Sequence, residues 1–470
     1  MPSRILLISA NRCTSPDPVF PLGLAHLNAA LRENGHETVW LDRLASADRF
    51  GETLRSCQPD FVGISLRNID DVLIRQRETF FDELASLGGN IRRHSAAPII
   101  LGGSGFSIFP RQLLELAGAD FGIAGEGEAA FLSLIDALKS GGDCRGIHGL
   151  VYRQDGEVKV NPAAVSRCEW ELTEADRPAA IAAHYLETSG MLNLQTQRGC
   201  RFRCCYCTYP LIEGKQHRRR SPEMVAAEFE RLQRQGARYV FVVDSIFNSS
   251  PRHVSETCEA VLRRGVKMAW GCFLRPQGLT AELMELMARA GLTHIEFGSD
   301  SFSDEALAAY YKDLTFEDIL HSSELASQQK VDYCHFLICG GPGETRATLQ
   351  AGFENSRRLR GAVIMAVVGM RIYPGTHLFD RAVAEGCITP DTDLLQPAYY
   401  LAPDLTEEAV FTQLQEFARL SPNWIVGHPT PAYTSLVERL RKRGVAGPLW
   451  SYFAMIQRLW PQGVTREASW

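Results

Sequence analysis

Three cysteines stand close together in the middle of the chain, in the run RGCRFRCCYC over residues 198–207. Cys200, Cys204 and Cys207 have the spacing C-x3-C-x2-C, and the aromatic residue Tyr206 precedes the last of them. Three thiolates in one short loop can ligate three irons of a cubane iron–sulfur cluster and leave the fourth iron without a protein ligand. An open iron can chelate a small molecule, which turns an electron carrier into a catalyst.

A structural zinc site, or a chance cluster of buried thiols, would use the same type of residue. Zinc takes four ligands, often as two separated pairs, and no second C-x-x-C pair or H-x3-H pair follows this run. Cys205 could supply a fourth thiolate, but adjacent side chains rarely point to one metal. We therefore expect a 4Fe–4S cluster on Cys200, Cys204 and Cys207, with Cys205 pointing away from it.

Composition places the chain among ordinary globular proteins. It has 470 residues with 45% hydrophobic and 22% charged residues, which predicts roughly two to four domains. A net charge of −6 gives no reason to expect nucleic acid as a partner. The 13 cysteines show no disulfide pattern, and no apolar stretch approaches the ~20 residues that span a bilayer. We expect a cytoplasmic protein with no membrane span.

The first third of the chain alternates apolar strand patterns with helical patterns. This alternation predicts right-handed βαβ crossovers and a parallel sheet, whose ligands bind beyond the carboxyl ends of the strands. The predicted strands cover residues 5–9, 38–41, 61–66, 98–101 and 121–124, and a long helix is expected around residues 72–93.

The ends of the third, fourth and fifth predicted strands carry small and polar residues. Glycines there let a ligand approach the backbone closely, although each segment alone also fits a tight strand-to-helix turn. The candidate residues are Ser65, Leu66, Arg67, Gly102, Gly103, Gly125, Glu126 and Gly127.

A second alternation begins at a predicted strand over residues 192–196, directly before the cysteine run. Five further strands, separated by helices, are expected at residues 239–243, 268–272, 294–297, 334–338 and 363–370. Six βα units predict a partial TIM-type barrel, whose chemistry lies at the carboxyl ends of its strands. Ser221 and Pro222 have the types preferred at an N-cap and a first helical position, which predicts the start of the first barrel helix.

The cysteine run resembles the signature loop of the radical S-adenosylmethionine (radical SAM) superfamily. In that family the open iron binds the amine and carboxylate of SAM, and one electron cleaves SAM to methionine and a 5'-deoxyadenosyl radical. The resemblance extends to D-x-x-F-N over residues 244–248 and to ICGGPGE over residues 338–344. It implies SAM contacts by Tyr206, Asp244, Arg275, Glu296, Ser299, Gly340 and Gly341. Asp244, Arg275 and Glu296 also fit barrel-rim ion pairs or helix caps.

Residues 1–145 resemble a cobalamin (B12)-binding domain of the Rossmann-like, flavodoxin-like type, on Gly102-Gly103 and on GEGE over residues 125–128. Many such domains carry D-x-H-x-x-G after the first strand, with a histidine on cobalt. Residues 11–18 read NRCTSPDP, and the nearest histidine, His26, lies in the first predicted helix. We expect cobalamin without a histidine ligand, or a vestigial domain that binds nothing.

We divide the chain into four segments. Residues 1–145 form the cobalamin-binding domain, 146–185 a linker with a hairpin at Asp155-Gly156, 186–395 the partial barrel and 396–470 an aromatic-rich helical cap. Most of the basic residues between 215 and 220 are expected to form a solvated surface run, and the alternative is that one or two face the barrel mouth and bind an anionic group of substrate or SAM.

The two resemblances together imply a cobalamin-dependent radical SAM enzyme that methylates an unactivated carbon. An alternative keeps both cofactors but closes, contracts or rearranges a ring without methyl transfer. An alternative of another class is a non-catalytic sensor that binds the cluster. The expected partners are a small-molecule, lipid or natural-product-like substrate and an external electron donor of the flavodoxin or ferredoxin type.

Overall fold

The computed structural model describes residues 2–14, 17–46, 50–163, 174–427, 435 and 439–452. The chain forms two compact units. The first unit comprises Met1–Val72, Gln76–Tyr185 and Thr208–Arg218, and the second comprises Leu73–Arg75, Leu186–Cys207 and Arg219–Trp470. The four segments drawn from the sequence remain a prediction.

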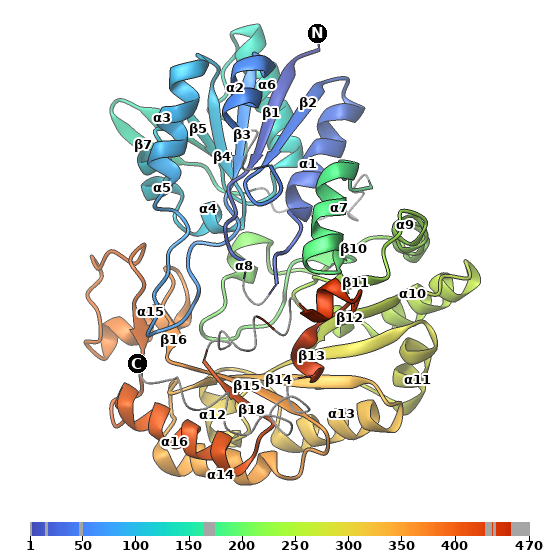
Figure 1. Cartoon of the computed structure of the whole chain (residues 1–470). Coiled ribbons are helices and arrows are strands. Elements are labelled where there is room, and N and C mark those ends of the chain that lie inside the picture. Colours follow the sequence, from blue (N-terminus) through green and yellow to red (C-terminus); the bar gives the residue numbers. More distant parts are fainter. Residues whose placement is uncertain are drawn as a thin grey trace. The chain divides into compact units, whose positions relative to one another are not determined.

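A seven-stranded sheet forms the core of the first unit, in the order β2-β1-β3-β4-β5-β6-β7 (Figure 1). Its first five strands are parallel and match the five predicted ones, with Ile5 of β1 opposite Phe61 of β3. The strand order reverses between β1 and β3, and a doubly wound sheet binds its ligand at such a switch point. The bounds are β1 Arg4–Ser9, β2 Glu37–Asp42, β3 Phe61–Ser65, β4 Ile99–Gly102, β5 Phe121–Ile123, β6 Leu150–Gln154 and β7 Glu157–Val160.

Helices cover both faces of this sheet, α1 and α6 on one face and α3 and α5 on the other (Figure 1). Leu24 and Leu31 of α1 pack with Leu134 of α6 against Ile5 and Leu7 of β1. The helices are α1 Leu22–Glu33, α2 Phe50–Cys57, α3 Leu84–His94, α4 Ser104–Ile108, α5 Pro110–Ala117, α6 Glu128–Ser140, α7 Ala179–Thr188 and α8 Tyr209–Ile212.

The long helix predicted around residues 72–93 is wrong for its first half. Only Leu84–His94 is helical, and the preceding residues form a loop closed by a bridge between Asp70 and Thr79. Val72 and Arg77 have positive φ angles of 54° and 49°, which a right-handed helix excludes. Ile74, Phe80 and Phe81 are buried as residues of this loop, whereas Val72 is exposed.

The hairpin predicted at Asp155-Gly156 is confirmed. Strands β6 and β7 are antiparallel, and the two turn residues have φ angles of 51° and 81°, as a type I′ turn requires. Strand β6 also pairs with β5, so the hairpin extends the first sheet. Residues 164–173, in the second part of the predicted linker, lie outside the described residues.

The second unit contains a seven-stranded parallel sheet, made of the six predicted barrel strands and β18, in the order β18-β15-β14-β13-β12-β11-β8. The strands are β8 Leu192–Leu194, β11 Tyr239–Val242, β12 Ala269–Leu274, β13 Leu292–Asp300, β14 Asp332–Cys339, β15 Val363–Val368 and β18 Trp424–Val426. Short strands lie outside this sheet at Gln197–Arg198 (β9), Arg218–Arg219 (β10), Met370–Arg371 (β16) and Tyr399–Tyr400 (β17).

Helices follow the barrel strands and line the outside of the sheet (Figure 1). Ser221 caps the first of them, since its side chain accepts from Met224 N and Pro222 is the first helical residue, as predicted. The elements are α9 Pro222–Arg234, α10 Pro251–Arg263, α11 Ala281–Arg289, α12 Asp304–Ala309, α13 Phe316–Gln328, α14 Arg346–Ser356, α15 His377–Ala384, α16 Glu407–Leu420 and the short 3-10 helices η2 Phe247–Ser249 and η3 Leu449–Tyr452.

The C-terminal segment differs from the purely helical cap that was expected. It contains α16 but also contributes β18, which pairs in parallel with β15 through Ile364 and Trp424. Trp424 and Phe417 pack together with Phe353 of α14, so the aromatic residues form a core, as the sequence favoured. Residues 453–470 lie outside the described residues. In the described part of the chain, no helix is both long and apolar enough to cross a membrane.

Candidate functional site

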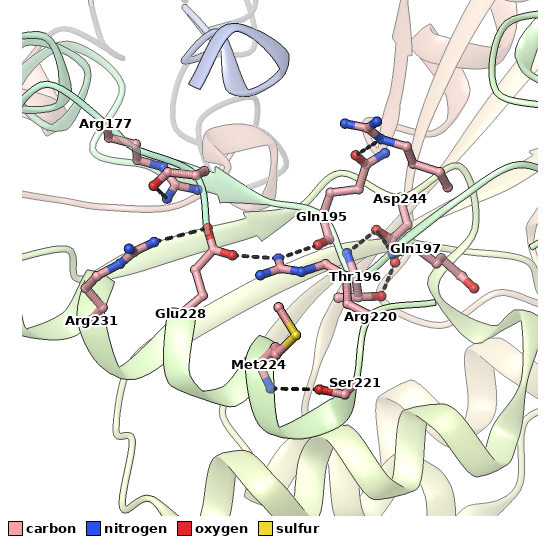
Figure 2. Close-up of polar contacts among 12 residues, drawn as sticks. Arg177, Gln195, Thr196, Gln197, Arg220, Ser221, Met224, Glu228, Arg231 and Asp244 are labelled. Atoms are coloured by element: carbon pink, nitrogen blue, oxygen red, sulfur yellow. Dashed lines mark hydrogen bonds and ion pairs between the residues drawn. The ribbon is translucent and has the colours of Figure 1, made fainter. Parts of the chain in front are cut away.

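The cysteine loop leaves the carboxyl end of β8, and the buried Asp244 carboxylate holds its start. Asp244 accepts hydrogen bonds from Thr196 N at 2.7 Å and Gln197 N at 3.2 Å, and from the Thr196 hydroxyl (Figure 2). A carboxylate that accepts several bonds from one turn fixes the backbone of that turn. Asp244 thus positions the strand-to-loop connection, while its predicted contact with SAM stays a prediction.

Cys205 is fixed through its backbone and buried through its side chain. Its N–H donates to Tyr310 O at 3.0 Å, its carbonyl accepts from Leu378 N at 2.8 Å, and its sulfur lies 3.8 Å from that of Met370. Burial raises the pKa of the Cys205 thiol to about 12. A protonated thiol in an apolar setting is a poor metal ligand. The arrangement supports the prediction that Cys205 is no ligand.

The three predicted ligands lie on both sides of Cys205, Cys200 being buried and Cys204 and Cys207 partly exposed. Burial raises the pKa of the Cys204 thiol, and the nearby cations Lys312 and Arg275 act in the opposite direction. No three His, Cys, Asp or Glu side chains are placed to hold a single metal ion within the described residues. A cubane cluster does not require three ligands on one ion, because each of its cysteines binds a different iron.

Tyr206 binds a buried acid that the sequence analysis missed. Its hydroxyl donates to Asp300 Oδ2 at 2.7 Å, and the Lys312 ammonium lies 2.8 Å from the same oxygen. Burial raises the pKa of the Tyr206 phenol well above its ordinary value. Asp300 ends β13, and the same strand-end rule that selected Ser299 could have found it.

Arg275 follows β12 and lies beside the cysteine loop. Its guanidinium lies 4.2 Å from the centre of the Phe202 ring, and its Nε donates to Gln277 Oε1 at 3.0 Å. The side chain is 4% exposed, and its buried Nη2 has no hydrogen-bond partner among the described residues. Burial lowers the pKa of Arg275, whereas the thiols of Cys204 and Cys200 raise it. An unpaired buried donor beside the loop fits an anionic group.

Glu296 and Ser299, two predicted SAM contacts that could bond its ribose hydroxyls, already have partners within the barrel. Trp450 Nε1 of η3 donates to Glu296 Oε1 at 3.0 Å, and Ser299 Oγ lies 2.8 Å from His335 Nδ1. His335 also contacts Ser323 Oγ, and burial lowers its pKa to about 3. A neutral His335 therefore links β13 to α13, and the ribose contacts stay predictions.

The predicted adenine-side glycines form a tight turn at the end of β14. Gly340 N donates to the Glu344 carboxylate, and Gly341 N donates to the Tyr310 hydroxyl at 3.1 Å. A side chain at Gly341 would place its Cβ 2.4 Å from that hydroxyl. Burial raises the pKa of Glu344 to about 7. The turn requires glycine for packing, and its contact with adenine stays a prediction.

Three predicted cobalamin segments meet at the carboxyl edge of the first sheet. Leu66 N donates to Gly102 O at 2.9 Å, and Ala10 N donates to Ser65 O at 3.0 Å. Gly103 has a φ of 102°, and a Cβ there would lie 2.4 Å from Leu66 O. Only glycine lets these two loops approach so closely.

Asn11, which the sequence analysis passed over, lies at the switch point between β1 and β3. Its side chain is 3% exposed, and neither amide atom has a hydrogen-bond partner among the described residues. Nearby Arg67 has a pKa lowered by burial, against the effect of Cys13, Tyr209 and Tyr185. Buried amides almost always find partners. The residues at this edge therefore fit a polar ligand such as cobalamin.

The family comparisons agree with both resemblances. Residues 194–353 match the model of the radical SAM superfamily, and residues 8–135 match that of the B12 binding domain. The chain is a B12-binding radical SAM protein.

The relatives of this B12-binding radical SAM protein include a methyltransferase and a cyclase. Tryptophan 2-C-methyltransferase of Streptomyces laurentii is 26% identical over 453 residues, covering 82% of this chain and 75% of that protein. Anaerobic magnesium-protoporphyrin IX monomethyl ester cyclase of Rubrivivax gelatinosus is 24% identical, covering 72% of this chain and 62% of that protein.

A solved structure shares the whole fold. The radical SAM methyltransferase TsrM of Kitasatospora setae, solved with cobalamin and a 4Fe–4S cluster, has a TM-score of 0.86 at 24% identity, and the match covers 98% of each chain. At this identity the likeness establishes the fold: an N-terminal B12-binding domain followed by a radical SAM domain.

Two arginines of the basic run are buried in this radical SAM protein, so the expectation of a solvated run is wrong for them. Arg218 donates to the carboxylate of Glu126, with one contact at 3.0 Å, inside the first unit. The predicted cobalamin residue Glu126 is thus already ion-paired. Gly125 and Gly127 flank it at the end of β5, and their cobalamin contacts, like that of Glu126, stay predictions.

The second buried arginine, Arg220, has no exposed side-chain surface and lies 2.6 Å from Glu228 Oε2 (Figure 2). It also donates to Gln195 O at 2.9 Å, beside the strand end that Asp244 holds (Figure 2). Removing one member of a buried ion pair is strongly destabilising, because the other charge is then left without a partner. Arg220 therefore anchors the start of the cysteine loop to α9.

Proposed function

We propose that this chain is a cobalamin-dependent radical SAM enzyme that methylates an unactivated carbon of a small molecule. The observation that carries the proposal is the cysteine loop at the carboxyl end of β8. There the buried Cys205 lies between Cys204 and Cys207, and Arg275, whose Nη2 has no hydrogen-bond partner among the described residues, lies alongside. The B12-binding domain and a methyltransferase relative support methyl transfer as the outcome.

The residues of the chain hold and orient the reacting groups. Cys200, Cys204 and Cys207 would hold the cluster, Arg275 Nη2 would pair with the SAM carboxylate, and Asn11 would bond cobalamin. When bound, the three cofactors supply an electron, a hydrogen-abstracting radical and a methyl carrier. The barrel strands supply a rigid frame that keeps the reacting atoms in place and away from water.

Cobalamin binding should depend on Asn11 and involve no histidine on cobalt. Replacing Asn11 by alanine removes the unpartnered amide at the β1–β3 switch point. We expect the Kd for cobalamin to rise about tenfold, the equivalent of roughly one polar contact. The EPR spectrum of bound cob(II)alamin should lack nitrogen superhyperfine splitting, since residues 11–18 contain no histidine.

Asn34→Ala is the matched control, because Asn34 follows α1 and donates to Ala30 O of the same helix. Its Kd should equal that of the wild type. A nitrogen splitting that disappears in the His26→Ala variant would contradict the account. Failure of the wild type to bind cobalamin would identify a vestigial domain.

The products of SAM distinguish methylation from ring formation, which the cyclase relative makes the second candidate. A methylase that uses both cofactors should form 5'-deoxyadenosine and S-adenosylhomocysteine in equal amounts with each product. Chromatography of reactions of reduced protein with its substrate measures both. 5'-Deoxyadenosine alone would favour the ring-forming alternative, and S-adenosylhomocysteine alone would exclude the radical step. Failure to cleave SAM by either route would favour a sensor.

We also propose a cytoplasmic location and an electron donor of the flavodoxin or ferredoxin type. No disulfide is found among the cysteines that the structure describes, as expected in a reducing compartment. Reduction of the cluster by a purified flavodoxin or ferredoxin, followed by optical absorbance, tests the donor. Cell fractionation tests the location.

A further inference from the structure

A buried network of three charged or polar side chains lies next to the cysteine loop. Lys312 Nζ is 2.8 Å from Asp300 Oδ2 and also donates to Gly298 O at 2.8 Å. The Tyr206 hydroxyl donates to the same Asp300 oxygen. The Lys312 and Asp300 side chains are 7% and 5% exposed. A buried ion pair offsets the loss of hydration only if its geometry is good and further hydrogen bonds satisfy both groups.

The backbone around this network is strained in the way that functional sites often are. Asp300, Tyr311 and Asp313 have positive φ angles of 64°, 59° and 47°. A non-glycine residue in the left-handed region is strained and persists only where the surrounding structure holds it there. The strand register also shifts between Phe297 and Asp300. The fold keeps an unfavourable backbone in order to place Asp300 and Lys312.

The strained segment is bonded to the cysteine loop at Cys205 and Tyr206, the two residues that follow Cys204. Tyr310 O accepts from Cys205 N at 3.0 Å, and Asp300 accepts from Tyr206. Asp313 O accepts from Gln277 Nε2 at 3.1 Å, and Gln277 binds Arg275. The Lys312 charge is therefore fixed with respect to the cysteines.

We propose that Lys312 is a positioning residue that raises the reduction potential of the cluster held by Cys200, Cys204 and Cys207. Reduction adds one electron, taken from the external donor, to a cluster that its thiolates make negative. A fixed ammonium in a low-dielectric environment favours the more negative state. Asp300 holds the ammonium in place, and Tyr206 joins the network to the loop. The inference rests on the proposed function, since it requires a bound cluster.

The main comparison is between variants that all carry Asp300→Asn, so that residue 300 is uncharged in each of them. Asp300→Asn keeps the shape of the side chain, and asparagine tolerates the left-handed backbone. In that background, Lys312→Met removes the cation without leaving an unpaired carboxylate, and Lys312→Arg retains the charge. Lys267→Met, at an exposed residue before β12, makes the same charge change outside the site. The measurements are iron content and the midpoint potential from an EPR-monitored redox titration.

We expect D300N/K312M to bind the cluster with a lower potential than D300N. At a fixed solution potential its ratio of reduced to oxidised cluster should fall about tenfold, which is ~59 mV for a one-electron couple. D300N/K312R should match D300N, and Lys267→Met should match the wild type. Equal potentials in D300N and D300N/K312M would overturn the inference. So would loss of iron in D300N/K312M with iron retained in D300N/K312R, because the network would then be structural only. A wild type without iron would instead refute the proposed function.

Discussion

Replacing Cys200, Cys204 and Cys207 together by alanine is expected to remove all cluster iron from the anaerobically reconstituted protein. The wild type should hold about four irons per chain, because one cubane on three thiolates accounts for the whole site. Iron analysis and the visible absorbance of the cluster measure the loss. The variant should still fold, since the Cys205 backbone contacts are unchanged.

Cys205→Ala is the matched control, because Cys205 lies between two ligands but is buried against Met370. Its iron content should stay close to that of the wild type, with a modest loss of stability from the missing sulfur. A cluster that is lost in Cys205→Ala but survives replacement of Cys200, Cys204 or Cys207 would mean that the ligands are wrongly assigned.

Breaking the Arg220–Glu228 pair should cause the largest change in stability. Glu228→Leu leaves the Arg220 guanidinium charged, with no exposed surface and without its 2.6 Å partner. Removal of one member of a buried pair costs about 3–5 kcal/mol, so the urea midpoint of unfolding should fall. The end of β8 should loosen with it, since Arg220 also binds Gln195 O.

The double variant Arg220→Met with Glu228→Leu separates the cost of an unpaired charge from the value of the pair. It should recover most of the lost stability, because apolar residues of similar volume replace buried pairs at little cost. Glu223→Gln, which breaks the exposed pair with Arg263, should change the midpoint little. A double variant no more stable than Glu228→Leu would show that the pair is needed as an ion pair.

The strand pattern was predictable because it depends on local features of the sequence. The five parallel strands of the first sheet and the six predicted strands of the second are marked by apolar runs in the sequence. Ser221-Pro222 marked the start of α9. The cluster loop was predictable because its chemistry lies within ten residues of sequence. The same holds for the glycines at strand ends, whose role depends on the backbone alone.

Features that depend on distant partners could not be predicted. The apolar residues after Val72 fit a helix by spacing, but a positive φ and tertiary contacts make them a loop. Strand β18 exists because Trp424 pairs with β15 about sixty residues away, and nothing local marks it. The sequence alone places Arg220 in a basic surface run. Its burial becomes evident only from the structure, in which it pairs with Glu228.

The candidate site also has features that the sequence predicts and features that only the structure shows. The sequence located the side chains at the strand ends but not which of them were already bonded within the chain. Asp244, Glu296 and Ser299 have internal partners, whereas Arg275 and the unpredicted Asn11 keep atoms that have no hydrogen-bond partner among the described residues. Hydrogen-bond satisfaction is a property of the packed structure, so only the fold could make this distinction.

The fate of the SAM methyl group tests the central claim most directly. Reconstituted, reduced protein with bound cobalamin should be given SAM carrying a deuterated methyl group, and the cobalamin and any product should be analysed by mass spectrometry. If the chain transfers the methyl group through cobalamin, we expect labelled methylcobalamin together with S-adenosylhomocysteine. The same label should appear in the product once substrate is supplied. Cobalamin that stays unlabelled, with a product that carries no label, would contradict it.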